Sequence, residues 1–351
     1  MPHSAEKRLF STLTFSLFTF YSYLCPCKKN NTALNKNGTK EKHHLMRFLA
    51  GLPLGVLYVL SDIAFPIIYY IIRYRRRLVR ENLRCSFPEK SKKELIRIEK
   101  AFYHNLCDVF IESFKCLNIS DEEMRRRVEV LNCELPERIA SEGKNVFMLL
   151  GHCGCWEWYQ EVSVRYKAPK KGAEIYKQIK SRYFSSLMQE VRSRWNTRQI
   201  EMSQAIRTLL SMSAEGEPFL CGFIQDQVLR GTKHKDVTYI LNQAIAVIPG
   251  AEELARKVNA ELVYLDVEKT ARGHYRLTFR EMTVPQDLQG RPFPLSFLYF
   301  RMLEETIRRQ PEIWLWSHNE WQKNDFVTSN LTRLKKFICA PLASHNRNCR
   351  E

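Results

Sequence analysis

The sequence has 351 residues, of which 44% are hydrophobic, and a formal net charge of +17 at pH 7. That length and apolar content exclude an intrinsically disordered chain and allow one large α/β domain with its own core. The basic balance predicts a polyanionic partner, which could be nucleic acid, an anionic membrane surface or an acidic carrier protein. The 11 cysteines are odd in number and irregularly spaced, which predicts reduced thiols in a cytosol-facing protein.

Residues 1–45 begin with an apolar stretch over 9–25 and continue with a polar stretch over 28–44. We expect a poorly ordered extension here. Either it belongs to the native protein, or the true start is Met46. No small-residue cleavage site follows the apolar stretch, which argues against a secretory signal peptide.

Residues 46–80 combine an apolar segment, 46–72, with a basic flank. The segment is about long enough to cross a bilayer, but Pro53, Asp62 and Pro66 interrupt it. A spanning helix and an interfacial anchor therefore both remain open. Arginines next to an apolar segment favour the cytoplasmic, anionic face of a membrane. We predict a membrane anchor over 46–80, against the alternative of a buried helix with a solvated basic end.

Two helices are expected next. Ser91 with Glu94 forms a capping-box pattern before a run of apolar residues at helical spacing. Within that helix His104 and Asp108 share one face, which we interpret as a solvated or capping pair. Ser120 starts a second helix, whose sequence is DEEMRRRVEVL.

After about residue 145 the pattern becomes α/β. Short apolar runs predict buried strands at 146–150, 219–224, 262–267 and 275–279. Helical patterns lie between them at 179–195, 202–214 and 250–258. This alternation predicts a mixed, mostly parallel sheet flanked by helices. We expect the domain to cover 81–330 and a tail to cover 331–351.

The segment LLGHCGCWEWYQE, 149–161, carries the candidate chemistry. A buried strand delivers His152 at its carboxyl end, the edge where α/β sheets bind ligands. Gly151 and Gly154 permit a tight turn, and Glu157 falls near the first turn of the next helix. An imidazole suits the removal of a proton from an attacking hydroxyl, and a carboxylate on its other nitrogen fixes the tautomer. The sequence therefore predicts His152 as general base and Glu157 as its partner.

The same residues allow other kinds of site. Cys153 or Cys155 could act as a covalent nucleophile, and the same turn could hold a metal, although no second ligand pair has zinc-like spacing. The basic runs would suit a non-catalytic binder of membranes or nucleic acid, but no nucleic-acid motif occurs. We expect no metal, no organic cofactor and no nucleic-acid partner.

The segment around His152 resembles the His-(four residues)-acidic motif of the lipid A secondary (lauroyl/myristoyl) acyltransferases. The resemblance covers roughly residues 52–325 and is closest to Bacteroidetes-type members. IYKQIKSRYFSSLMQEVRSRWN is similar to the family's Tyr-basic block, FIQDQ to its Asp-Gln segment, and WLWSHNEWQ to its closing Trp-rich motif. LNQAIAVIPGAEE lacks the Thr-Pro that often precedes this glycine in relatives.

The resemblance implies a glycerolipid-acyltransferase-like fold and an enzyme at the cytoplasmic face of the inner membrane. Such an enzyme esterifies a lipid A precursor, an anionic glycolipid, with acyl carrier protein as the usual donor. By position, His152 is the base and Glu157 its partner. Lys177 and either Arg192 or Arg194 would bind phosphate or stabilise the oxyanion, and Asp226 would organise the site. Acylation of another glycolipid or aminolipid, or the use of acyl-CoA, is the nearest alternative.

Overall fold

The computed structural model describes residues 43–162, 169, 171–177, 181–195, 197–227, 236–318 and 321. Most of the expected N-terminal extension, residues 1–42, and the whole expected tail, 331–351, lie outside the described residues. The described helices are α2 (His44–Gly51), α3 (Leu54–Pro66), the π-helix η1 (Ile67–Ile72), α4 (Arg76–Ser86), α5 (Lys92–Lys115), α6 (Asp121–Arg127), α7 (Glu134–Ser141), α9 (Arg182–Arg192), α10 (Ala205–Ala214), α11 (Gly250–Lys257) and α12 (Pro294–Arg309). Short 3-10 helices are η2 (Trp156–Gln160), η3 (Ser193–Trp195), η4 (Met202–Gln204), η5 (Gln286–Leu288) and η6 (Pro311–Ile313).

Prolines divide the apolar N-terminal segment. Leu52 is extended (φ −67°, ψ 149°) and Pro53 caps α3, as expected where the ring of a proline crowds the preceding residue. Pro66 ends α3, and the following residues form a π-helix, because proline removes a backbone donor and disturbs the regular ladder. The segment therefore consists of two α-helices separated by a break at Leu52 and Pro53, and a π-helix that follows Pro66.

A seven-stranded sheet forms the centre of the protein, in the order β1-β9-β8-β2-β5-β3-β4. Its neighbours pair in parallel except for β8 and β9, which form an antiparallel hairpin. The strands are β1 (Val128–Leu131), β2 (Asn145–Leu150), β3 (Lys171–Tyr176), β4 (Arg198–Glu201), β5 (Phe219–Ile224), β8 (Ala260–Ala271) and β9 (His274–Glu281). A separate hairpin joins β6 (Val237–Ile240) to β7 (Gln243–Ala246).

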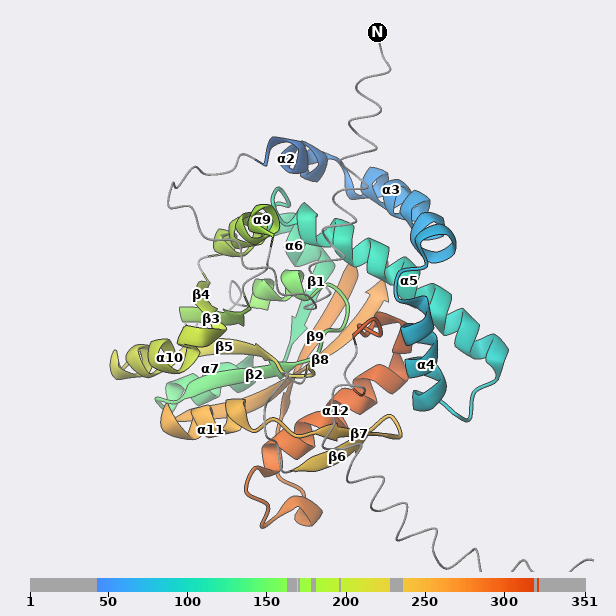
Figure 1. Cartoon of the computed structure of the whole chain (residues 1–351). Coiled ribbons are helices and arrows are strands. Elements are labelled where there is room, and N and C mark those ends of the chain that lie inside the picture. Colours follow the sequence, from blue (N-terminus) through green and yellow to red (C-terminus); the bar gives the residue numbers. More distant parts are fainter. Residues whose placement is uncertain are drawn as a thin grey trace, which may run out of the picture.

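Helices cover both faces of the sheet, with α3 and α5 on one side and α11 and α12 on the other (Figure 1). The side chains of β8 and β9 show the two layers. Tyr264 bonds to Thr306 of α12 at 2.8 Å, whereas Tyr275 donates to Glu112 of α5 at 2.7 Å. The central strand β2 is buried at every residue, as expected for a parallel strand covered on both faces.

The expected fold class is confirmed as a mixed, mostly parallel sheet flanked by helices. The strand expected at 219–224 has those bounds, and the capping box of Ser91 and Glu94 starts α5. The sequence analysis did not predict the elements with weaker periodicity, which are β1, β3, β4, the β6–β7 hairpin and α12. The helix expected from DEEMRRRVEVL ends at Arg127, where its last residues become β1, because β1 pairs with β9 along its whole length.

Candidate active site

A tight turn after β2 places His152 at the carboxyl edge of the sheet. A Cβ on Gly151 would meet Leu303 Cδ1 at 2.5 Å, and one on Gly154 would meet Tyr275 Cε1 at 2.5 Å. Gly154 also has φ +59°, a conformation that favours glycine. Both glycines are therefore required for the turn to lie this close to α12 and β9.

The C-terminal Trp-rich segment holds the backbone of this turn. The N–H of Leu315 donates to the His152 carbonyl at 3.1 Å, and the N–H of Gly154 donates to the Ile313 carbonyl at 2.8 Å. Cys153 and Trp314 form an antiparallel bridge between these bonds. The turn that carries His152 is thus fixed by residues more than 150 positions away along the chain.

Asp226 is the carboxylate that contacts His152. Its Oδ1 lies 2.6 Å from Nδ1 of the ring, and its Oδ2 accepts the His152 backbone N–H at 2.9 Å and the Trp314 Nε1–H at 2.8 Å. Because a carboxylate only accepts, Nδ1 carries the hydrogen and Nε2 has a lone pair. The Gln227 amide nitrogen lies 3.4 Å from Nε2, and Trp156 packs edge-on against the ring.

The neighbours of Asp226 keep it charged. Its side chain is 3% exposed. Burial acts to raise the pKa of Asp226, but the attraction of His152 and the hydrogen bonds from His152 and Trp314 outweigh it and lower that pKa below its usual range. The imidazole itself is 17% exposed, so the site combines a buried anion with a ring that reaches the surface.

Glu157 does not pair with His152 as expected. It lies in η2, 3% exposed, and Arg192 of α9 donates to both of its oxygens, from Nη2 at 2.7 Å and from Nε at 3.0 Å. The physical reason is that the 3-10 turn carries residue 157 toward α9, where a buried carboxylate gains a bidentate guanidinium. The expected pairing is therefore corrected: Asp226 contacts the histidine, and Glu157 contacts Arg192.

Glu174 on β3 adds a second carboxylate to this ion pair. Its Oε1 lies 3.8 Å from Arg192 Nε and has no hydrogen-bond partner among the described residues. Burial raises the pKa of Glu174 to about 7; Arg192 acts to lower it, and the charge of Glu157 raises it further. Two acids thus compete for one guanidinium. The sequence offered no signal for Glu174, because β3 was not recognised.

The remaining expected site residues differ in their surroundings. Lys177 follows β3 and is exposed. Arg194 donates from Nη1 to the Cys116 carbonyl at 2.8 Å and lies over the Trp195 ring at 5.2 Å. The structure therefore brings together His152 with Asp226, and Glu157 with Arg192, whereas Arg194 packs against the end of α5.

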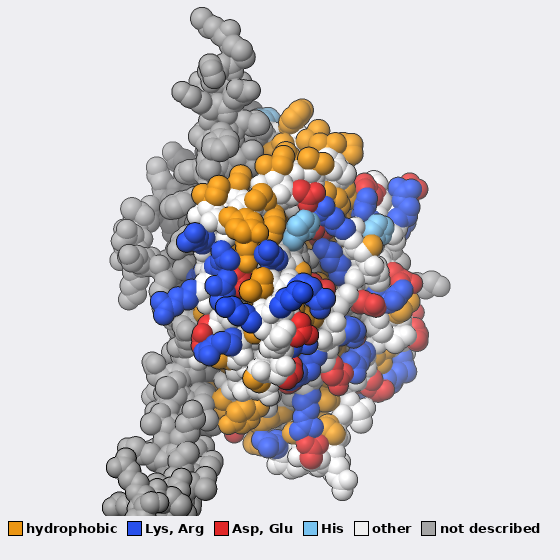
Figure 2. Space-filling model, turned by 90° about the vertical axis from the view of Figure 1, so that its right-hand side faces the viewer, with side chains coloured by type: hydrophobic (Ala, Val, Ile, Leu, Met, Phe, Trp, Pro, Cys, Tyr) orange, Lys and Arg blue, Asp and Glu red, His pale blue; other side chains and the backbone are white. Residues whose placement is uncertain are grey.

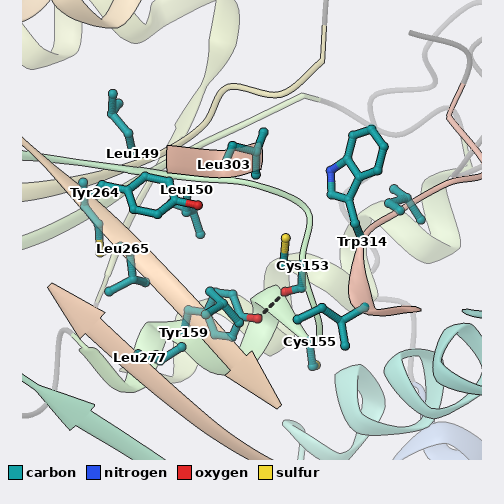
Figure 3. Close-up of a cluster of buried hydrophobic side chains, with 14 of the residues drawn as sticks. Leu149, Leu150, Cys153, Cys155, Tyr159, Tyr264, Leu265, Leu277, Leu303 and Trp314 are labelled. Atoms are coloured by element: carbon teal, nitrogen blue, oxygen red, sulfur yellow. Dashed lines mark hydrogen bonds between the residues drawn. The ribbon is translucent and has the colours of Figure 1, made fainter. Parts of the chain in front are cut away.

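Both cysteines of the turn point into the core. Figure 3 shows Cys153 and Cys155 among buried aromatic and aliphatic side chains, with the Tyr159 hydroxyl donating to the Cys153 carbonyl. Burial raises the pKa of both thiols well above the usual range, so neither is present as the thiolate that a covalent mechanism needs. The covalent alternative is not supported by this geometry.

Two contributors to the site were missed by sequence reasoning, Trp314 as a donor to Asp226 and Gln227 beside the ring. Gln227 lies within the FIQDQ segment and Trp314 within the Trp-rich segment. Both segments were noted as motifs, but only their place beside His152 reveals what they contact. The Asp226–His152 pair at the carboxyl edge of the sheet has the geometry that general-base catalysis requires, with a carboxylate on one ring nitrogen.

The model of the family described as bacterial lipid A biosynthesis acyltransferase matches residues 43–323. The chain belongs to this family and is an acyltransferase. Among solved structures, the chain is similar to the 1-acyl-sn-glycerophosphate acyltransferase PlsC from Thermotoga maritima, at 14% identity and a TM-score of 0.31, over 74% of this chain and 99% of that one. A comparison with curated proteins finds no match.

Proposed function

We propose that the protein transfers a fatty acyl chain from an acyl thioester to a hydroxyl of a lipid A precursor, with His152 as general base. The observation that carries the proposal is the 2.6 Å contact between His152 Nδ1 and Asp226 Oδ1. It supports the tautomer with the hydrogen on Nδ1, in which Nε2 can accept a proton. The family of the chain supports acyl transfer as the reaction.

The reaction needs one proton to move twice. The acceptor hydroxyl attacks the thioester carbonyl while Nε2 of His152 takes its proton, so a C–O bond forms and the carbonyl oxygen becomes an oxyanion. When this intermediate collapses, the C–S bond breaks and the imidazolium returns the proton to the departing sulfur. The Asp226 carboxylate stabilises the imidazolium between these steps. General-base help of this kind contributes ~10²–10⁴-fold to a rate.

Arg192 is proposed to supply fixed positive charge near the reacting groups, for an oxyanion or a phosphate. Its bidentate pairing with Glu157 supports this role, because a guanidinium held in one orientation loses little entropy on binding an anion. Glu157 is then a positioning residue rather than the partner of the base. Lys177 is proposed as a further contact for an anionic acceptor because it is exposed directly after β3, the strand that carries Glu174 beside Arg192.

The basic balance of the chain supports its proposed partners. An acidic acyl carrier protein, a phosphorylated glycolipid and the anionic cytoplasmic face of the inner membrane would each be attracted to a protein with a net charge of +17. The donor is proposed to be acyl carrier protein. If acyl-CoA supports the same rate at lower concentration, that choice fails while the reaction class stands.

Mass spectrometry of lipid A tests the proposal directly. Cells that lack the gene should lose one acyl chain from lipid A, and the wild-type gene should restore it. The His152→Ala gene should not restore it, whereas His44→Ala, which replaces an exposed histidine, should. Unchanged lipid A in the deletion strain, or restoration by His152→Ala, would refute the proposal.

A further inference from the structure

The inner face of the N-terminal apolar helix carries hydrogen-bonding side chains beside its buried apolar ones. Along α3 and η1, Tyr58 donates to Glu112 at 2.9 Å, Ser61 donates to Asp108 at 2.7 Å, and Tyr69 donates to Glu99 at 3.1 Å. The three acceptors belong to α5 in reverse order. The apolar helix therefore lies antiparallel along α5 over its whole length, attached by hydrogen bonds to buried acids.

A charged cluster reinforces this contact. Arg272, in the turn between β8 and β9, donates to Asp108 at 2.6 Å and to Asp62 at 2.7 Å, and His104 lies 2.9 Å from Asp62. Burial acts to raise the pKa of Asp108, yet hydrogen bonds from His104 and Arg272 and the charge of Lys269 lower it to about 2. His104 and Asp108 do lie together, at 3.7 Å, but Asp108 is not solvated as expected: α3 and Arg272 enclose it, and it is 2% exposed.

The outer face of the same helix is apolar and uncovered by any described residue. Within the described part of the chain, Leu54–Ile72 is the helix long and apolar enough to cross a membrane, and only 22% of it is buried. Its large apolar side chains that are about half exposed or more are Val56, Val59, Ile63, Tyr70, Ile71 and Ile72, and Phe48 of α2 adds to them; Asp62, also 48% exposed, is held by Arg272. Figure 2 shows apolar side chains gathered at the upper end of the face that includes α3, with Lys and Arg side chains beside them.

This distribution differs from that on a helix at a water-facing surface. Such a helix turns its apolar side chains toward the core and its polar side chains toward solvent. Here the inner face is mixed, with Leu54, Leu57 and Ile68 buried beside the hydrogen-bonding side chains, whereas further valines and isoleucines face outward. Large exposed apolar patches mark interaction sites, and this pattern fits an apolar medium on the outer side.

A spanning orientation conflicts with the contacts on both flanks of the helix. Before it, His43 bonds to Ser186 of α9 at 2.9 Å, and Lys115 of α5 donates to the carbonyls of Ala50 and Leu52. After it, Arg75 donates to the Ser317 carbonyl at 2.7 Å. Both flanks are therefore attached to the same folded body.

The neighbouring helix gives a second reason. Because α5 follows α3 and η1 along their length, it would enter the bilayer with them. Lys100 of α5, which is exposed and lies 5.9 Å from the Tyr70 ring of η1, would then enter hydrocarbon, at a cost of about 2.5–3.5 kcal/mol.

We propose that Leu54–Ile72 lies in the plane of an anionic lipid bilayer, with Val56, Val59, Ile63 and Ile71 inserted at the interface and α5 held above it. The charge of the adjoining segment is complementary to anionic lipid, because Arg73 and Arg77 are exposed directly after the helix. The helix is a docking face on one leaflet and does not cross the membrane. This inference deepens the proposed function, since it brings the acyltransferase to a lipid acceptor from the cytoplasmic side only.

Binding to vesicles tests the docking face without turnover. The full-length protein should sediment with vesicles of phosphatidylglycerol and phosphatidylethanolamine, and less with phosphatidylcholine alone. Ile63→Asp and Ile71→Asp, at positions 56% and 75% exposed, should each weaken this binding at least tenfold. Ile206→Asp, at a 60% exposed position on α10, is the matched control and should bind as the wild type does. Wild-type protein that stays in solution, or equal losses for Ile63→Asp and Ile206→Asp, would overturn the proposal.

Labelling tests the orientation. Arg47→Cys and Arg77→Cys each add one exposed thiol on opposite flanks of the helix. In inverted inner-membrane vesicles, a membrane-impermeant maleimide should add one more label to each variant than to the wild type. In intact spheroplasts, neither variant should gain a label relative to the wild type. Any other distribution of label contradicts an in-plane helix. His152→Ala should bind vesicles normally, so a failure of the proposed chemistry can be told apart from a failure of membrane docking.

Discussion

Replacement of Asp226 by asparagine separates the contact seen in the structure from the one that the motif suggested. The carboxylate accepts two hydrogen bonds at Oδ2, from the His152 backbone and Trp314, and one at Oδ1 from Nδ1. An amide has only one oxygen. If that oxygen keeps the two converging donors, the NH₂ group faces Nδ1, which must then accept and leave the hydrogen on Nε2.

The wrong tautomer cannot take a proton from the acceptor hydroxyl. We expect Asp226→Asn to lower kcat by ~10²–10⁴-fold, or about 3–5 kcal/mol in the activation free energy, with little change in KM. Loss of a buried charge-assisted bond should also lower the free energy of unfolding by about 1–3 kcal/mol. Because the pKa of Asp226 is lowered in the folded state, this contribution is present above the carboxyl group's ordinary pKa and is lost as pH falls through the lowered value.

The assay follows release of the thiol from an acyl thioester in detergent micelles that contain the lipid acceptor. Circular dichroism establishes that the variant is folded at the assay temperature. Asp287→Asn is the matched control, because Asp287 is exposed and pairs with Arg301 at the surface. A kcat for Asp226→Asn within tenfold of the wild type would refute the assignment of Asp226 as the residue that orients the base.

Three further predictions concern the other buried charges. Glu157→Gln should lower the free energy of unfolding by about 3 kcal/mol, because a neutral amide replaces the buried carboxylate that accepts two hydrogen bonds from Arg192; a urea titration that shows less than 1 kcal/mol would contradict the buried pair. The pKa of Glu174 is raised to about 7, so stability falls as pH rises from its ordinary value through 7, and Glu174→Gln should stabilise the protein by about 2–3 kcal/mol at pH 8 but not at pH 4. Asp108, with its pKa lowered to about 2, contributes stability above pH 4 that is lost toward pH 2. Asp108→Asn should therefore cost about 2 kcal/mol at pH 7 in a denaturant titration, and a smaller difference at pH 7 than at pH 3 would refute this sign.

Much of the framework could be predicted because it depends on local pattern. Apolar runs identified β2 and β5, and the capping box located the start of α5. The short strands β3 and β4 lack such runs, since β3 contains Lys171 and Glu174 and its residues are mostly half-buried. These strands form because β3 pairs with β5 and β4 with β3, a long-range pairing that no local window contains.

By itself the sequence determined that a buried strand ends in a glycine turn bearing His152, that a carboxylate follows five residues later, and that a long apolar segment precedes the domain. Only the tertiary structure decided which carboxylate meets the imidazole. Leu150 pairs with Ile224 across the parallel strands β2 and β5, so Asp226, 74 residues away in sequence, lies beside His152. The helical periodicity likewise revealed an apolar segment but not which face turns outward. That was decided by packing, because buried acids of α5 accept hydrogen bonds from Tyr58 and Ser61 on the same side of α3 that buries Leu54 and Leu57.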